Sequence, residues 1–127
     1  MPLTRISVPQ HLATSQVKAL AEAVQTGLVQ TCNVPVDDCF QLITRFAAED
    51  MNLNPVFGNM ARTRDASVVE ITFLHGRTDD QKRALYRRVT DDAAAAGYKP
   101  DDIMIALTEN APIDWTLGQG LAFNGHS

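Results

Sequence analysis

The chain opens on an alternation of apolar and polar side chains. Leu3, Ile6 and Val8 occupy the apolar positions, and this pattern is typical of a strand. The segment Pro9-Gln10-His11 breaks the alternation, so we expect the strand to end there.

The period then changes to that of a helix. From Val17 to Leu28 apolar residues recur three or four positions apart and form one apolar face. Thr14 or Ser15 is the expected N-cap. We expect the helix to stop near Cys32-Asn33, because Pro35 disfavours helix in the residue before it.

Asp37-Asp38 follows as a turn, and Cys39–Phe46 is predicted to be the second strand. Residues 47–66 are punctuated by asparagine, proline and glycine. This composition predicts a loop with at most a short strand around Val56-Phe57.

The second half repeats this order. Ser67–Leu74 is the most strand-like run of the chain. Thr78-Asp79-Asp80-Gln81 is a capping box that starts a helix, which Gly97 ends. Ile103–Leu107 is the next predicted strand, and the tail from Glu109 onward is glycine-rich and irregular.

The two halves, about 2–46 and 67–108, resemble each other and indicate an internal duplication within a single domain that spans residues 1–127. Two joined β-α-β units predict an α+β fold, a four-stranded mixed sheet with both helices on one face. Apolar residues also fall on the other sheet face, which nothing in the chain covers. That face predicts association of subunits through their sheets.

Composition narrows the classes of function. The 127 residues are 45% hydrophobic, and 11 basic against 15 acidic side chains give a net charge of −4. No basic stripe is present to bind nucleic acid. No membrane-spanning segment or signal peptide is evident, so the expected location is the cytoplasm. The two cysteines and three histidines lack the spacing of a metal site, and none is expected.

The start of the chain carries candidate chemistry. Pro2 directly follows Met1, and removal of Met1 would free a secondary amine. An α-amino group titrates far below a lysine, so it can serve as an acid, base or nucleophile near neutral pH. A Met-Pro start is also common in chains where it has no function.

Four further residues could complete a site. Arg77 lies one residue before a helix N-cap, where a guanidinium and helix-start amides could clamp a carboxylate; it could equally be a surface arginine. Asp38 fits a turn as well as a catalytic role. Trp115 could line a pocket or pack in the core. His75 is a candidate general acid or a plain loop residue.

The order of these motifs resembles the tautomerase superfamily. The shared features are a Pro-first β-α-β start, Gly76-Arg77-Thr78 opening the second unit, a P-x-D turn before each closing strand, Arg62-Thr63, and E-N-x-x-x-D-W ending in Asp114-Trp115. The resemblance extends from Pro2 to about Gly120 and is strongest to the malonate semialdehyde decarboxylase-like branch.

The resemblance implies a homotrimer with a pocket at each subunit boundary. Pro2 would be the acid, base or imine-forming amine, and Asp38 would activate water or hold the protonated amine. Arg77 would bind the substrate carboxylate and Trp115 would line the pocket. The same resemblance makes His75, Arg62 and Leu117 candidate substrate-binding residues.

Two positions depart from the family pattern. Some decarboxylases carry Arg-Pro-Arg where this chain has His75-Gly76-Arg77, so the first arginine is missing. Leu117 stands where several members have phenylalanine, which changes the size of the pocket wall.

The expected function is therefore that of a cofactor-independent enzyme acting on small oxo-carboxylates. Decarboxylation with hydratase capability, as in malonate semialdehyde decarboxylase, is the first expectation. A phenylpyruvate-type keto-enol tautomerase is the alternative, and a non-catalytic ligand-binding trimer is the third possibility.

Overall fold

The computed structural model describes residues 1–125; His126, one of the three histidines considered for a metal site, lies outside this range. The first half holds β1 (Leu3–Pro9), α1 (Thr14–Cys32) and β2 (Gln41–Phe46). The second half holds β3 (Ser67–Leu74), α2 (Asp79–Ala95) and β4 (Ile103–Asn110). Short 3₁₀ turns lie at Ala48–Asp50, Pro100–Asp102 and Pro112–Asp114.

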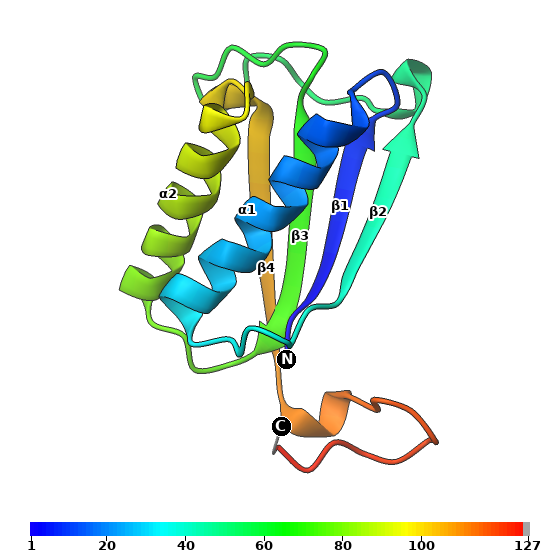
Figure 1. The fold of residues 1–127 in the computed structure, drawn as a ribbon, viewed down its shortest axis with the longest axis vertical. Coiled ribbons are helices and arrows are strands. Elements are labelled where there is room, and N and C mark those ends of the chain that lie inside the picture. Colours follow the sequence, from blue (N-terminus) through cyan, green and yellow to red (C-terminus); the bar gives the residue numbers. More distant parts are fainter. Residues whose placement is uncertain (126–127) are drawn as a thin grey trace.

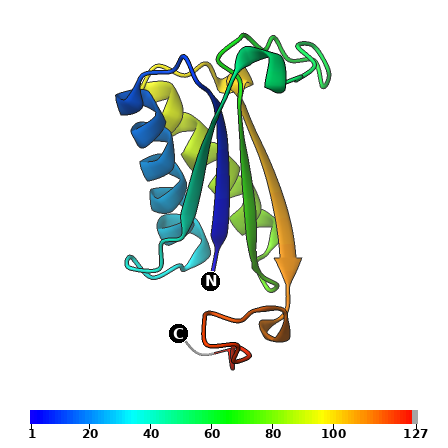
Figure 2. The ribbon, with the colours of Figure 1, turned by 90° about the vertical axis from the view of Figure 1, so that its right-hand side faces the viewer.

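The four strands form one mixed sheet in the order β2-β1-β3-β4 (Figure 1). Within each half the two strands run parallel, while β1 and β3 pair antiparallel at the centre. Both helices cover the same face of the sheet (Figure 2). The duplicated β-α-β arrangement predicted from the sequence is confirmed.

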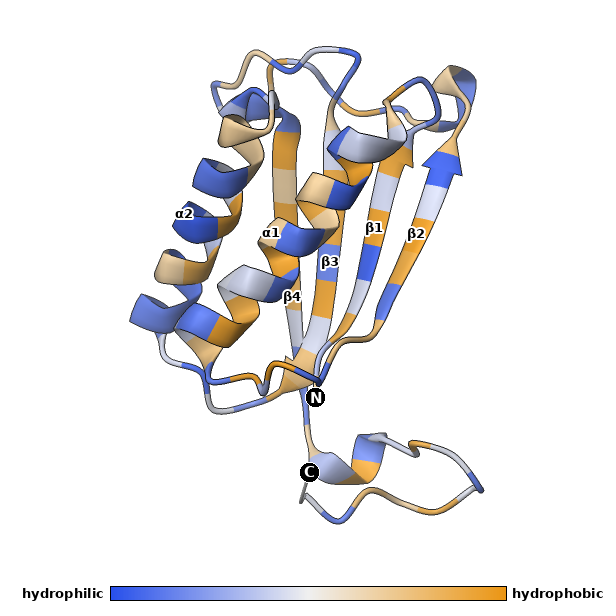
Figure 3. Cartoon of the chain, viewed as in Figure 1, coloured by the Kyte–Doolittle hydropathy of each residue, from blue (hydrophilic) through white to orange (hydrophobic). Residues whose placement is uncertain are grey.

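Strand alternation decides which side chains form the core. On the central strands Ile6, Val8, Val69, Ile71 and Phe73 are buried beneath the helices. The helices supply Leu20, Val24, Leu28, Leu85 and Val89 from their apolar stripes. Figure 3 shows the corresponding alternation of apolar and polar residues along the strands.

The two helices approach closely at Gly27. A Cβ atom at this position would lie 2.9 Å from Val89 Cγ2 and 3.1 Å from Leu85 Cδ1. Such distances are well inside ordinary van der Waals contact, so a larger side chain would force the helices apart. A glycine in the middle of α1 is therefore required by packing against α2.

The uncovered face of the sheet is amphipathic. Leu42 on β2 and Met104 on β4 are exposed there, as the sequence led us to expect. At the centre of the same face, however, Arg5 on β1 stands directly opposite Glu70 on β3, and both are exposed. The face therefore combines apolar edges with a pair of opposite charges.

Several element boundaries differ from the sequence predictions. Ala13 occupies the N-cap of α1 without a side-chain hydrogen bond, and Thr14 Oγ1 accepts from Arg45 Nη2 at 3.4 Å. The strand predicted from Cys39 begins at Gln41. No strand forms at Val56-Phe57, because both backbone N–H groups donate to the Asn54 side chain in a turn.

The C-terminal segment leaves the body of the molecule after β4. Residues 111–125 project beyond the end of the sheet (Figures 1 and 2), and Ile113, Leu117 and Leu121 are exposed on them. One bridge between Thr116 and Ala122 closes the segment on itself. Over residues 1–125, no helix is long and apolar enough to span a bilayer.

Candidate active site at the N-terminal end of the sheet

The site lies where β1 begins and where β3 and β4 end. Leu3 pairs with Thr72, so the start of the chain is next to the last residues of β3. Leu74 pairs with Asn110 in the same way on the next strand. β3 and β4 both end here and lead into turns. Residues that are far apart in the sequence therefore lie together at one end of the sheet (Figure 1).

The N-terminal amine faces the carboxylate of Asp38. The Met1 nitrogen lies 3.2 Å from Asp38 Oδ2, and the two side chains are only 9% and 11% exposed. Asp38 Oδ1 is buried and has no hydrogen-bond partner among residues 1–125. Pro2, the next residue along the chain, is buried. An amine and a carboxylate in contact, with one oxygen unused, can move a proton or hold a polar ligand.

The segment that carries Asp38 is fixed to helix α1. The Asp38 backbone N–H donates to Pro35 O at 3.0 Å. Gln25 Nε2 donates to Asp38 O at 3.2 Å and to Val36 O at 3.4 Å. Gln25 therefore positions the catalytic candidate through its backbone. The sequence predictions missed this residue, since a lone polar side chain on a helix gives no signal.

Arg77 is bound within the fold. Its Nη1 donates to Leu74 O at 3.0 Å and its Nη2 donates to Cys32 O at 3.3 Å. The guanidinium also lies 4.9 Å from the centre of the Phe73 ring. Cys32 is the last residue of α1, where unpaired carbonyls give the helix end a partial negative charge that favours a cation. Arg77 is therefore not a free surface arginine.

The expected clamp of helix-start amides is only partly available. In α2 the Gln81 N–H donates to Thr78 Oγ1 at 3.1 Å, and the Thr78 N–H donates to Gln81 Oε1 at 2.8 Å. This is the predicted capping box, and it uses two of the amides at the helix start. Any carboxylate at this place would depend chiefly on the guanidinium.

The turn before Arg77 is held from β4. His75 N–H donates to Asn110 O at 2.8 Å, and Gly76 N–H donates to Glu109 Oε2 at 3.3 Å. Gly76 has φ +120, which strains any residue with a side chain. Glu109 Oε1 also accepts from Lys82 Nζ at 2.7 Å. This hydrogen bond lowers the pKa of Glu109 and raises the pKa of Lys82, so both stay charged near neutral pH.

Asn110 connects this turn to Trp115. Asn110 Oδ1 accepts from the Trp115 indole Nε1 at 2.6 Å, while its backbone oxygen accepts from His75. One residue therefore orients both the tryptophan and the turn that leads to Arg77. Glu109 and Asn110 were not predicted as site residues, although they begin the E-N-x-x-x-D-W motif and could have been found there.

The structure brings together only part of the predicted set. Asp38, His75, Arg77 and Trp115 lie at the same end of the sheet as Pro2, although His75 is exposed. Leu117 belongs to the projecting C-terminal segment and is exposed. Arg62 lies at the opposite end, where its Nη1 donates to Asn54 O at 2.8 Å and to Phe57 O at 2.9 Å. Within one subunit Arg62 is thus remote from the amine.

Fold and site together define a duplicated β-α-β protein whose N-terminal amine is paired with a carboxylate, with an arginine at the same end of the sheet. The chain belongs to the tautomerase enzyme family, whose family model matches residues 38–118. The resemblance seen in the sequence motifs is confirmed.

A curated relative and two solved structures agree with this assignment. The probable tautomerase YusQ of Bacillus subtilis (strain 168) is 28% identical over 123 residues, 96% of this chain and 97% of that protein. FG41 malonate semialdehyde decarboxylase, inhibited by 3-bromopropiolate, is 30% identical with a TM-score of 0.87 over 94% of this chain and 91% of its own. A second malonate semialdehyde decarboxylase, studied for its decarboxylase and hydratase activities, is 25% identical with a TM-score of 0.85 over 94% and 92%.

The fold extends to a more distant protein. A fused 4-OT, described as a symmetric trimer, is 21% identical with a TM-score of 0.77 over 94% of both chains. At this identity the likeness concerns the fold alone.

Proposed function

We propose that this chain is an N-terminal-proline enzyme acting on small oxo-carboxylates, with malonate semialdehyde decarboxylase chemistry and hydratase capability. The observation that carries the proposal is the contact of 3.2 Å between the N-terminal amine and Asp38 at a nearly buried place. A carboxylate there stabilises an ammonium ion and can activate water.

Removal of Met1 is the first step of the proposal. The new terminus would be the Pro2 nitrogen, one residue further along the chain and already buried. Met1 itself is almost fully enclosed, so its loss would leave a space beside Asp38 that a small substrate could fill. Asp38 Oδ1, which has no hydrogen-bond partner among residues 1–125, would be free to bind the proline ammonium or a water molecule.

In decarboxylation the cationic Pro2 would polarise the aldehyde carbonyl by donating a hydrogen bond to it. Alternatively, Pro2 would first pass its proton to Asp38, add to the aldehyde and expel water to form an iminium, which water hydrolyses after carbon dioxide has left. The bond between the carboxylate and the α-carbon breaks, carbon dioxide leaves, and the carbonyl or iminium takes up the electron pair. A proton then returns to the α-carbon. Arg77 would hold the substrate carboxylate, and Trp115 and His75 would border the pocket. No cofactor takes part.

Arg62 and Leu117 remain in the proposed substrate-binding set only across a subunit boundary. Arg62 is remote from Pro2 in its own chain, and Leu117 lies on the projecting segment. The homotrimer that we propose would place such segments against a neighbouring subunit.

A keto-enol tautomerase is the second candidate. The name of the Bacillus subtilis relative, probable tautomerase, favours it. This reaction needs a neutral Pro2 that carries a proton between carbon and oxygen, so the charge of one amine separates the two functions. A ligand-binding trimer without chemistry is the third candidate, and the amine-carboxylate contact argues against it.

The deciding experiment compares the chain with and without Met1. We expect the trimmed protein to decarboxylate malonate semialdehyde and to act only weakly on phenylpyruvate. The same chain retaining Met1, confirmed by mass spectrometry, should be inactive because its Pro2 nitrogen is an amide. Equal activity of both forms would contradict the proposal, and activity on neither substrate would favour the ligand-binding trimer.

The assembly can be tested separately. The exposed Leu42 and Met104 at the edges of the uncovered sheet face, and the projecting segment 111–125, lead us to expect a homotrimer at micromolar concentration. Sedimentation velocity measures this directly. A monomer would contradict the shared-pocket arrangement, whereas the amine-carboxylate contact within one chain would remain.

The remaining expectations are part of the same proposal. We propose a cytoplasmic protein in one duplicated domain, with a small oxo-carboxylate as its partner and no binding to nucleic acid or membrane. The net charge of −4 supports the exclusion of nucleic acid.

A further inference from the structure

A cavity lies at the end of the sheet opposite to Pro2. It has a volume of about 390 Å³ and is lined by Pro9 at the end of β1, His11 from the turn after it, Met51 and Leu53 from the long loop, and Arg64 and Ala66 before β3. This volume falls in the range of small-molecule sites. None of these residues takes part in the amine site.

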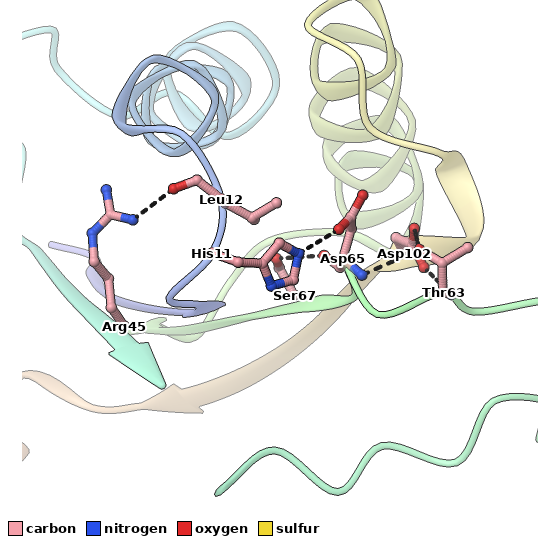
Figure 4. Close-up of polar contacts among 7 residues, drawn as sticks. All are labelled: His11, Leu12, Arg45, Thr63, Asp65, Ser67 and Asp102. Carbon is pink, nitrogen blue, oxygen red and sulfur yellow. Dashed lines mark hydrogen bonds and ion pairs between the residues drawn. The ribbon is translucent and has the colours of Figure 1, made fainter. Parts of the chain in front are cut away.

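One wall of the cavity is fixed by a buried carboxylate. Asp102 is 2% exposed; its Oδ1 accepts from Thr63 N–H at 2.7 Å and its Oδ2 from Thr63 Oγ1 at 2.6 Å (Figure 4). Thr63 Oγ1 in turn accepts from Asp65 N–H at 3.2 Å. Hydrogen bonds to a buried charge are strong, so the segment that carries Arg64 is held in place before any ligand arrives.

The facing wall is tied to the first. His11 Nε2 lies 2.6 Å from Asp65 Oδ1, and Ser67 Oγ donates to Asp65 O at 3.1 Å (Figure 4). On the other side of His11, Leu12 O accepts from Arg45 Nη1 at 3.0 Å. His11 and Asp65, which are 54 positions apart in the sequence, are thus joined beside the cavity. The cavity is therefore formed before any ligand binds.

The lining selects the charge of a ligand. Arg64 has no hydrogen-bond or ion-pair partner within residues 1–125 and presents a cation at the cavity. Asp65, the nearest acidic side chain in sequence, is already paired with His11. Glu49 and Asp50 lie on the neighbouring 3₁₀ turn but do not line the cavity. Because Arg64 is one cation without an acidic partner, the cavity is suited to a ligand with a single negative charge.

The lining also selects the body of a ligand. Pro9, Met51, Leu53 and Ala66 provide apolar surface in the lining of the cavity. The apolar part of a ligand bound there is removed from water, which favours binding. The carboxylate at the other end of the same ligand remains close to Arg64. From this combination we propose that the cavity is a second binding site, for a monocarboxylic acid with a short apolar body.

Phenylacetate is a suitable probe, because it joins one carboxylate to one small apolar ring. Titration into the nitrogen-labelled chain should shift the backbone amide signals of His11, Leu53 and Arg64, with a Kd on the order of 1–10 mM for a ligand of this size. Phenylacetamide, which has the same shape without the charge, should bind about tenfold more weakly or not at all.

Two variants make the test specific. Arg64→Gln should weaken phenylacetate binding at these amides about tenfold, while Arg87→Gln, which removes an exposed arginine on α2, should leave it unchanged. Shifts confined to Gly76 and Arg77, no shifts at 20 mM probe, or equal binding by Arg64→Gln and the unaltered chain would each overturn the proposal. These amide signals do not depend on activity at Pro2, so the two proposals can fail independently.

Discussion

Asp38→Asn in the trimmed protein is expected to lower the pKa of the Pro2 amine. The reason is the carboxylate itself, whose Oδ2 lies 3.2 Å from the terminal nitrogen when Met1 is present. A negative charge at such a distance favours the cationic amine, and asparagine keeps the shape while removing the charge. Arg77 has the opposite effect on the amine, but its guanidinium is occupied by Leu74 O and Cys32 O.

The change in charge should separate the two reactions. Decarboxylation depends on a cationic Pro2, so we expect kcat/KM for malonate semialdehyde to fall by about 10²-fold or more. Ketonisation of phenylpyruvate depends on a neutral amine and should be spared or improved. Hydration should be lost with decarboxylation, because no carboxylate remains to activate water.

An NMR titration of nitrogen-labelled proline measures the pKa directly. Asp37→Asn is the matched control, since Asp37 is the exposed neighbour in the same turn and makes no ion pair with the terminus. We expect that control to keep the Pro2 pKa and both activities. A pKa near 6 in the unaltered protein would mean a mostly neutral amine, and the tautomerase function would then take first place.

The fold could be predicted because local patterns determine it. Strand alternation at Ser67–Leu74, helical spacing from Val17 to Leu28 and the capping box at Thr78 all act over a few residues. Predictions were wrong where contacts between residues far apart in the sequence determine the local structure. Thr14 does not cap α1, and its hydroxyl meets Arg45 from β2 instead. Nothing in the sequence around Thr14 reports that contact.

The site could be predicted only as a set of residue types. Motifs indicate Pro2, Asp38 and Arg77, and the structure places them at one end of the sheet. Gln25 holds the Asp38 segment through backbone contacts and belongs to no motif, whereas Asn110 stands in the E-N-x-x-x-D-W motif without a predicted role. Arg62 shows the reverse case, because a motif suggested it and the fold sets it at the far end. Motifs indicate which reactive side chains the chain contains. Strand register and turn geometry determine which of these side chains lie close together in the fold.

Arg77→Ala is expected to change both activity and stability. If the guanidinium holds the substrate carboxylate, kcat/KM should fall by roughly ten- to a hundred-fold. The free energy of unfolding should also fall, by about 1–3 kcal/mol, because Cys32 O and Leu74 O lose a charged donor. The contact with the end of α1 is the reason for this expected loss of stability.

Two further variants separate binding from folding. Arg77→Lys keeps the positive charge but cannot donate to both carbonyls in one plane, so it should recover part of the activity and little of the stability. Arg83→Ala removes an exposed arginine paired with Asp80 and should leave kinetics and melting within error. Steady-state kinetics measure the effect on activity, and urea denaturation measures the effect on the free energy of unfolding. Lowered stability with unchanged kinetics would mean that Arg77 only holds the end of α1. The substrate carboxylate would then need another binding group, and Lys82 on α2 and the exposed His75 in the turn before Arg77 are the candidates.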